Sequence, residues 1–227
     1  MTKELKKRQE RDLLRPPFYY FWFNLIKITA AIPGLVWFRP KTIYSTPEAK
    51  KKYKKGVLFF SNHSGMGDPL WVMLGVWYRR VHFVAMQDIL DNPKMRFWFE
   101  KGFRVIPVDR ENVGFNFVKK VSGFLDAGCA VCIFPEGHIN ISEDRVDQFK
   151  NGMILLAIKA KVPLVPLYVQ TRKHWYNRQI MFQGEEIDLL KMYGPTPSMA
   201  QIEEAGKLCR EREIELAKLA DEYFSGK

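Results

Sequence analysis

The sequence VLFFSNHSGMGDP occupies residues 57–69 and joins three kinds of local structure. Its first residues form an uninterrupted apolar run, which is typical of a strand that is buried on both faces. A glycine-rich loop follows, and Pro69 suits the first position of a helix. The stretch therefore predicts a strand, a tight loop and the start of a helix.

The same alternation of strand and helix continues to the C-terminus. We predict strands at 57–61, 81–86, 104–108, 130–134, 163–169 and 179–184, and helices at 69–78, 93–101, 114–126, 147–161 and from Ser198 onward. At the last helix, Gln201 completes a capping box with Ser198. This order predicts an α/β fold, a mixed, largely parallel sheet flanked by helices. Functional sites in such folds lie at strand ends.

The chain has 227 residues and a formal net charge of +11, which is concentrated near the N-terminus. Residues 1–55 hold +10 of this charge and residues 56–227 hold +1. We therefore divide the chain into a basic, aromatic N-terminal segment, 1–55, and a globular domain, 56–227. The charge indicates a polyanionic partner, which is a nucleic acid, an anionic membrane or a phosphorylated substrate.

The segment PPFYYFWFNLIKITAAIPGLVWF at 16–38 lies between two basic stretches. Dense aromatic residues bracketed by Lys and Arg are typical of a bilayer interface. We predict a helix over 18–31, ended by Pro33 and Gly34, that lies in one leaflet as a membrane anchor. A spanning helix and an apolar hairpin packed on the chain's own domain are the alternatives. Nucleic-acid binding fits less well, because the aromatic residues do not alternate with the basic ones.

Several potentially reactive side chains are predicted to be structural. Three cysteines indicate a reducing compartment rather than a disulfide framework. Cys129 and Cys132 lie in the apolar run of a predicted strand, where residues three apart point to opposite faces, so we expect no shared metal site or disulfide there. His82 is predicted to be a core histidine, and His174 belongs to a polar turn. We expect no metal and no cofactor.

His63 and Asp68 are the side chains of the first loop that best suit catalysis. On a helix their spacing would separate them by about 140°. Gly65 and Gly67 instead let the chain fold tightly, so that Asp68 at a helix start reaches back to the imidazole. A carboxylate bound to one ring nitrogen makes the other nitrogen a base for an alcohol. The alternative is a histidine that only caps the turn.

Four blocks of the sequence resemble the glycerolipid acyltransferases, which acylate lysophosphatidate and glycerol 3-phosphate. NHSGMGD at 62–68 is similar to the first motif of that family, N-H-x4-D. GFRVIPVDR at 102–110 resembles the second block, FPEGH at 134–138 the third, and FKNGMILLAIKAKVPLVPLYV at 149–169 the stretch that leads into the fourth. The blocks keep the order of the family.

The resemblance implies that His63 is the general base and Asp68 its orienting partner. It also implies that Arg110 binds the acceptor's phosphate and that Glu136 and Gly137 shape the phosphate pocket. Asn62, Gly102, Pro135 and Pro163 are further matches to the motifs. From the residues alone, a surface ion pair of Arg110 and a helix cap by Glu136 remain open.

The third block departs from the family's pattern. His138 and Ile139 stand where the family usually has Thr or Ser and then Arg. One cationic contact to a phosphate is therefore missing, and a protonated His138 replaces it only in part. Arg145 is a nearby substitute in the sequence, and Arg104 is predicted to lie on a strand on the same side as Arg110.

The resemblance implies an acyltransferase domain at 56–227. Its expected reaction moves a fatty acyl group from acyl-CoA or acyl carrier protein to the free hydroxyl of 1-acyl-sn-glycerol 3-phosphate. The expected product is phosphatidic acid, an intermediate of phospholipid synthesis. The expected partners are a lysophospholipid acceptor, the acyl donor and an anionic membrane surface, but no nucleic acid. We expect a monotopic or single-span protein at the cytoplasmic face of the cell membrane. An acyltransferase for another lysolipid or polar-headed alcohol, and a non-catalytic lipid-binding module, are the alternatives.

Overall fold

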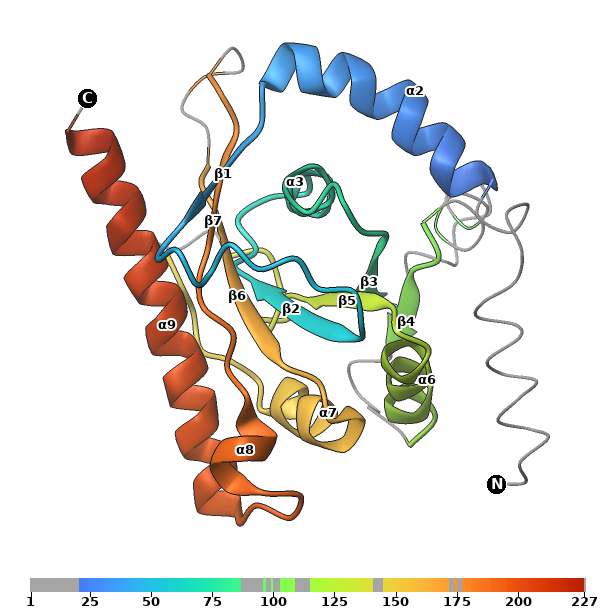
Figure 1. Ribbon diagram of the computed structural model, residues 1–227, viewed down its shortest axis with the longest axis vertical. Helices are drawn as coiled ribbons and strands as arrows, with labels where there is room; N and C mark the ends of the chain where they lie inside the picture. Colours follow the sequence, from blue (N-terminus) through green and yellow to red (C-terminus); the bar gives the residue numbers. More distant parts are fainter. Residues whose placement is uncertain are drawn as a thin grey trace.

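The structure, a computed structural model, describes residues 21–86, 96, 99, 103–108, 115–140, 145–171, 174 and 177–226. Most of the predicted helix 93–101 lies outside these residues, as do Gly102 and Arg110. The described part consists of one sheet with helices on both of its faces (Figure 1).

Seven strands form the sheet in the order β1-β7-β6-β2-β5-β3-β4. They are β1 Lys41–Tyr44, β2 Val57–Ser61, β3 Val81–Met86, β4 Ile106–Val108, β5 Ala130–Ile133, β6 Leu164–Val169 and β7 Ile180–Gln183. Neighbouring strands are parallel except for β6 and β7, which are antiparallel. The predicted mixed, largely parallel sheet is confirmed. β1 was not predicted, and it places part of the basic N-terminal segment in the sheet.

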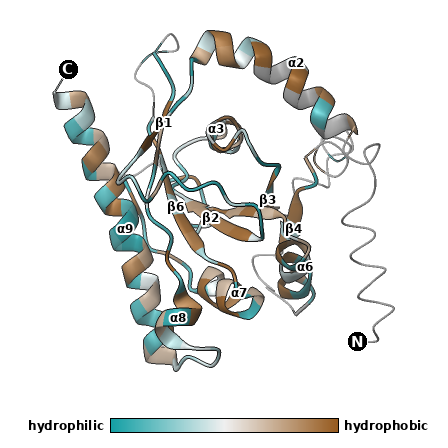
Figure 2. Cartoon of the chain, viewed as in Figure 1, coloured by the Kyte–Doolittle hydropathy of each residue, from teal (hydrophilic) through white to brown (hydrophobic). Residues whose placement is uncertain are grey.

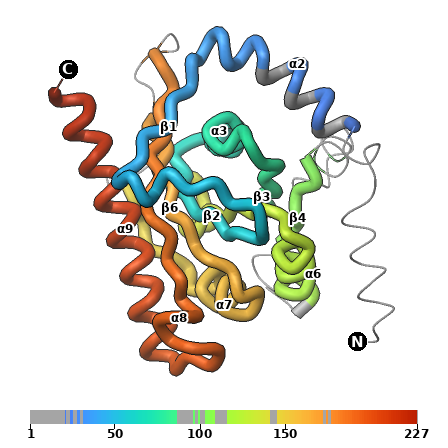
Figure 3. The backbone as a smooth tube through the Cα atoms, viewed as in Figure 1, coloured from blue at the N-terminus to red at the C-terminus, as the bar shows by residue number. Residues whose placement is uncertain are grey.

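The helices surround this sheet on two sides. They are α2 Phe21–Phe38, α3 Asp68–Gly75, α6 Phe115–Asp126, α7 Gly152–Ala160, α8 Leu189–Tyr193 and α9 Met199–Ser225. Residues of α6, α7 and α9 share one apolar cluster with one face of the sheet, and residues of α3 share another cluster with the opposite face. α9 runs from α8 to the end of the chain alongside β6 and β7 (Figure 3).

The central strand β2 explains the apolar run from which the fold was predicted. All of its residues are buried. Leu58 and Phe60 belong to the cluster with α6 and α7, whereas Val57 and Phe59 belong to the cluster with α3. Because both faces are covered by helices, the strand has no polar side to expose.

The helix predicted at 147–161 starts later than predicted for a physical reason. It begins only at Gly152. Before it, the Lys150 amide donates to the Pro135 carbonyl at 3.0 Å, and Arg210 of α9 donates to the carbonyls of Val146 and Asp147 at 2.9 Å each. These bonds take the backbone groups that a longer helix would use. The capping box at Ser198 is confirmed.

The helix α2 continues through Pro33 to Phe38, so the prediction that Pro33 and Gly34 end the helix is wrong. Proline removes one backbone hydrogen bond, but the turns after it are held by packing on α3. The Phe38 ring meets Trp71 edge-on at 4.7 Å between centroids, and Gly34 is buried. Figure 1 shows α2 arching over α3. Among the described residues, no helix is long and apolar enough to cross a membrane.

Candidate active site

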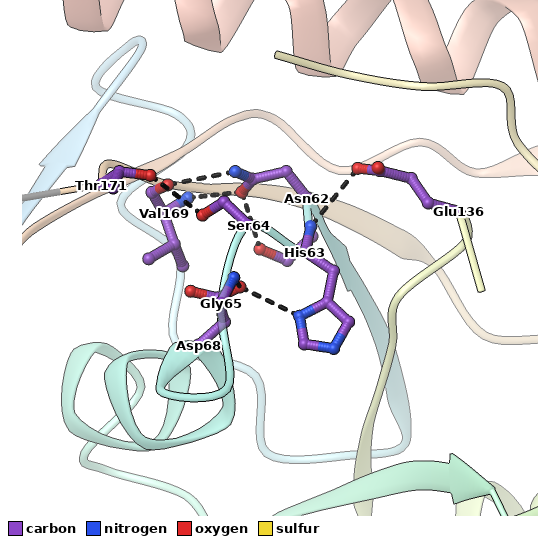
Figure 4. A network of polar contacts seen from close by, with 9 residues as sticks. Asn62, His63, Ser64, Gly65, Asp68, Glu136, Val169 and Thr171 are labelled. Carbon is purple, nitrogen blue, oxygen red and sulfur yellow. Dashed lines mark hydrogen bonds and ion pairs between the residues drawn. The ribbon is translucent and has the colours of Figure 1, made fainter. Parts of the chain in front are cut away.

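The candidate site lies where the central parallel strands end. The loop 62–67 follows β2, and the loop that begins at Phe134 follows β5. Thr171 lies two residues beyond the end of β6. Because β2 pairs in parallel with both β5 and β6, these three chain segments meet at one edge of the sheet. Figure 4 shows the polar contacts among them.

His63 and Asp68 are in contact, as their spacing predicted. The His63 Nδ1 atom lies 3.0 Å from the Asp68 Oδ2 atom. The same Oδ2 accepts a hydrogen bond from the Gly65 amide at 2.8 Å. Asp68 is the first residue of α3 and is buried, whereas the His63 side chain is 18% exposed. A carboxylate only accepts hydrogen bonds, so Nδ1 carries the proton and Nε2 presents a lone pair.

The Asn62 side chain fixes the backbone on which His63 stands. Its Nδ2 donates to the Val169 carbonyl at 3.1 Å, and its Oδ1 accepts from the Val169 amide at 2.8 Å. The side-chain amide therefore continues the β2–β6 pairing past the last residue of the strand. Beyond it, the hydroxyl of Thr171 donates to that of Ser64 at 3.0 Å. These bonds make the start of the loop rigid, which a positioned base requires.

The third block reaches the His63 backbone from the side of β5. The Glu136 Oε1 atom accepts from the backbone N–H of His63 at 3.3 Å, and the backbone N–H of Asn140 donates to the His63 carbonyl at 2.6 Å. Glu136 is buried, and burial raises the pKa of its carboxyl, while the His63 amide acts in the opposite direction. Glu136 therefore supports the loop of His63 rather than capping a helix in the described structure.

Phe134 is a site residue whose role sequence reasoning missed. Its ring stacks on the His63 imidazole at 4.3 Å with an angle of 22° between the planes. On its other side it stacks with Phe83 at 6.3 Å. The only sequence signal was its place in the third block, since stacking depends on the register between β5 and β2. The ring restricts the imidazole to one orientation.

Gly137 adopts a left-handed conformation with φ of +75°, which suits glycine. A Cβ at this position would lie 3.1 Å from the Lys150 Nζ atom. The Lys150 side chain thus crosses the third-block turn, although it comes from the segment before α7. The backbone of Pro135, in the same turn, accepts the Lys150 amide. Lys150 is the second site residue that the sequence analysis missed.

His138 makes two contacts in this turn. Its Nδ1 atom lies 3.1 Å from the Glu136 carbonyl oxygen, and its Nε2 atom lies 3.1 Å from the Asp147 Oδ2 atom. Both neighbours are hydrogen-bond acceptors. An imidazolium can donate to both of them, because it has two N–H donors.

The remaining predicted site residues lie elsewhere. Arg110 and Gly102 are outside the described residues. The Pro163 carbonyl accepts from the Leu58 amide at 3.1 Å, at the end of β2 opposite to the site. Arg145 forms an ion pair with Asp221 on α9, so it does not replace the missing arginine of the third block.

The prediction that Arg104 lies on a strand is wrong. Its φ is +49°, and β4 begins only at Ile106. The guanidinium lies over the Phe124 ring, 5.4 Å from its centroid. This position is close to His82, whose pKa is lowered to about 4 by burial and by the Arg104 charge. His82 is 1% exposed and packs edge-on against Phe124, which confirms it as a core histidine.

Cys129 and Cys132 pack with different apolar clusters on the two sides of the sheet, as predicted. Burial raises the pKa of both thiols. In the described part of the chain, no group of His, Cys, Asp or Glu side chains is arranged to hold a metal ion.

Comparisons with known proteins identify the family of the chain. Residues 41–170 match the family model described as Acyltransferase. The chain is 33% identical over 152 residues to the 1-acyl-sn-glycerol-3-phosphate acyltransferase of Bacillus subtilis (strain 168), which covers 67% of this chain and 71% of that protein.

A probable 1-acyl-sn-glycerol-3-phosphate acyltransferase of Mycoplasma pneumoniae is 27% identical over 156 residues, covering 65% of this chain and 54% of that protein. The crystal structure of the 1-acyl-sn-glycerophosphate (LPA) acyltransferase PlsC from Thermotoga maritima superposes with a TM-score of 0.59 at 14% identity. That match covers 95% of this chain and 98% of the other. At this identity the likeness concerns the fold.

Proposed function

Because the chain belongs to the acyltransferase family, whose model matches residues 41–170, we propose that it acylates the free hydroxyl of 1-acyl-sn-glycerol 3-phosphate. The acyl group comes from a thioester of coenzyme A or acyl carrier protein, and the product is phosphatidic acid. The observation that carries the proposal is the contact of Asp68 with His63 Nδ1, which leaves Nε2 as the basic atom. The names of the similar proteins support the choice of acceptor.

The proposed reaction is a direct transfer between the two substrates. His63 Nε2 takes the proton of the acceptor hydroxyl while the hydroxyl oxygen attacks the thioester carbonyl. The tetrahedral intermediate then expels the thiolate, which takes the proton from the imidazolium and leaves as a thiol. An ester C–O bond forms and the thioester C–S bond breaks. Asp68 stabilises the imidazolium that exists between the two proton transfers.

The phosphate of the acceptor requires cations, and the structure supports two of them at the third block. We place Lys150 there because its ammonium lies at the Gly137 turn, where the family's arginine is replaced by Ile139. Among the described residues, the Lys150 ammonium has no ion-pair partner. His138 is the second cation, although Asp147 neutralises part of its charge. Arg110 is the proposed third, on the basis of the resemblance alone.

The proposed membrane contact is the exposed face of α2, which is apolar (Figure 2). The exposed large apolar residues of this helix are Phe21, Leu25, Ile28, Ile32, Leu35, Val36 and Trp37. A contiguous apolar face of this kind on a protein surface marks an interaction site. We propose that it lies in the cytoplasmic leaflet of the cell membrane, with the flanking Lys and Arg residues contributing about 1 kcal/mol each at an anionic surface.

The acyl transfer is tested with purified protein, lysophosphatidate and a labelled acyl donor, with the product identified by mass spectrometry. We expect phosphatidic acid from the wild type and almost none from His63→Ala. A suitable control is His174→Ala, because His174 is an exposed histidine. Full activity of His63→Ala would refute the mechanism. Absence of thiol release from either donor would favour a lipid-binding module instead.

The acceptor is tested separately because the third block is altered. A mixture of lysolipids and polar-headed alcohols is offered with the same donor, and the acylated products are identified. We expect lysophosphatidate to be the preferred acceptor. Preference for a neutral acceptor would retain the acyltransferase and overturn the proposed phosphate site.

A further inference from the structure

The C-terminal helix α9 supports the third block at several points, although it follows all four sequence blocks. Arg210 binds the carbonyls of Val146 and Asp147. A Cβ on Gly206 would lie 2.4 Å from the Asn151 Oδ1 atom, so the helix approaches this segment as closely as a glycine allows. α9 therefore packs directly against the chain that carries Lys150.

Glu213 is a carboxyl group on the buried face of α9. It is 0% exposed, and in the described part of the chain neither of its oxygens has a hydrogen-bond partner of normal geometry. Along the helix it is four residues after Cys209 and three before Leu216, both of which are buried apolar residues. A charged residue is almost never placed at such a position without a partner. The position therefore calls for an explanation other than packing.

Two of the groups around Glu213, Glu136 and Asn62, belong to the candidate site. Burial and the Glu136 carboxyl raise the pKa of Glu213 well above its usual range, and the backbone N–H of Asn62 opposes this only in part. Its other titratable neighbours are Cys132 on β5 and Cys209 on α9, whose pKa values are raised by burial and, secondarily, by Glu213. Burial raises the pKa of Tyr168 on β6, and Glu213 contributes in the same direction. Among the described residues, no cation contributes to the shift of the Glu213 pKa.

Glu136 also has an oxygen without a partner. One of its oxygens accepts from the His63 backbone N–H, but the other, Oε2, is buried and has no hydrogen-bond partner among the described residues. Two buried carboxylates that act on each other repel, so the protonation of one favours the charge on the other. A charge on both carboxyls would push Glu136 away from the His63 backbone.

We propose that Glu213 is a positioning residue of the acyltransferase, a neutral carboxyl that keeps Glu136 and the Asn62–His63 backbone in place from the far side of the site. This inference rests on the proposed function, since positioning is meaningful only for the His63 base. Glu213 contacts neither substrate. Its ionisation introduces the second charge and displaces Glu136.

The test compares Glu213→Gln and Glu213→Leu with Glu211→Gln, which makes the same change at an exposed position of the same helix. We expect Glu213→Gln to keep the kcat of the wild type with protonated Glu213, and to lose the fall in kcat that ionisation of Glu213 should cause in the wild type as the pH rises. Glu213→Leu should lower kcat by roughly 10- to 100-fold, as a small misplacement of a base does, with little change in the KM for lysophosphatidate. A Glu213→Gln pH profile that superimposes on that of the wild type overturns the proposal, even if Glu213→Leu does not fold.

A second readout does not depend on activity. The folded protein keeps the Glu213 proton above about pH 4.3, where the unfolded chain loses it, so this carboxyl makes folding less favourable as the pH rises. The melting temperature of Glu213→Gln should therefore increase relative to the wild type as the pH rises above about 4.3. A constant difference would overturn the proposal. If the wild type acylates no lysophosphatidate, the proposed function fails, but this measurement still shows whether Glu213 is neutral.

Discussion

Replacement of Asp68 by asparagine tests the electrostatic role of the carboxylate while it keeps the shape of the site. The Gly65 amide donates to the Asp68 Oδ2 atom at 2.8 Å. In Asp68→Asn the Gly65 N–H favours the rotamer that places the asparagine side-chain oxygen at the position of Oδ2. In the flipped rotamer the side-chain NH2 group would face the Gly65 N–H, and two donors would meet. The oxygen therefore still accepts from His63 Nδ1, and the change removes the negative charge without removing the hydrogen bond.

The magnitude follows from the distance between the two groups. With Nδ1 and Oδ2 3.0 Å apart, the centres of the two charges are about 4 Å apart, where an effective dielectric constant of about 20 gives about 4 kcal/mol. The dipole of the asparagine retains part of this stabilisation of the imidazolium. We expect a loss of about 3 to 4 kcal/mol, which corresponds to roughly 10²- to 10³-fold in kcat.

The assay measures thiol release from the acyl donor under saturating lysophosphatidate. Asp126→Asn is the matched control, because Asp126 is an exposed residue at the end of α6. Circular dichroism and melting temperatures confirm that both variants are folded. A kcat of Asp68→Asn within about threefold of the wild type, a difference below about 1 kcal/mol, would refute the reasoning.

Three further outcomes are expected. Lys150→Ala should raise the KM for lysophosphatidate about tenfold, or about 1.4 kcal/mol, and leave that for an uncharged acceptor unchanged; an equal effect on both acceptors contradicts the phosphate role. Ile32→Glu, on the exposed face of α2, should reduce the fraction of protein that sediments with anionic liposomes more than the control Glu48→Gln does. Equal sedimentation of the two variants contradicts the membrane contact. Glu213→Gln should gain up to about 1.4 kcal/mol of stability over the wild type per pH unit above about 4.3, until Glu213 ionises in the folded state, which chemical denaturation at several pH values measures.

The strands were predictable because most of them are buried on both faces. The runs at 57–61 and 81–86 have the observed bounds, because most of their residues are apolar. β1 was missed because it is a four-residue strand at the edge of the sheet, with one exposed and three half-buried residues and a lysine at its start. Its pairing with β7 is a contact between segments more than 130 residues apart, which local patterns do not indicate.

The site divides in the same way between local and distant contacts. His63 and Asp68 were predictable as neighbours because the loop between them is short and contains two glycines. Phe134, Lys150 and Glu213 come from three other segments, and the sheet register and helix packing bring them together. Glu213 did have a sequence signal, which is an acidic residue on the apolar face of the predicted last helix. The sequence does not indicate that this position faces Glu136.

The helix α3 connects the proposed membrane face to the catalytic loop. Its Trp71 ring meets Phe38 at the end of α2. A Cβ added at Gly67 would lie 3.0 Å from the Trp71 Nε1 atom, so the ring also packs closely on the catalytic loop. Asp68 is the first residue of the same helix. Because packed side chains transmit rather than absorb displacement, α2 and the loop of His63 keep a fixed relative orientation. In the proposed membrane contact, an acceptor whose acyl chain stays in the same leaflet as α2 would present its hydroxyl to His63 from a constant direction, which would supply the orientation that general base catalysis alone does not.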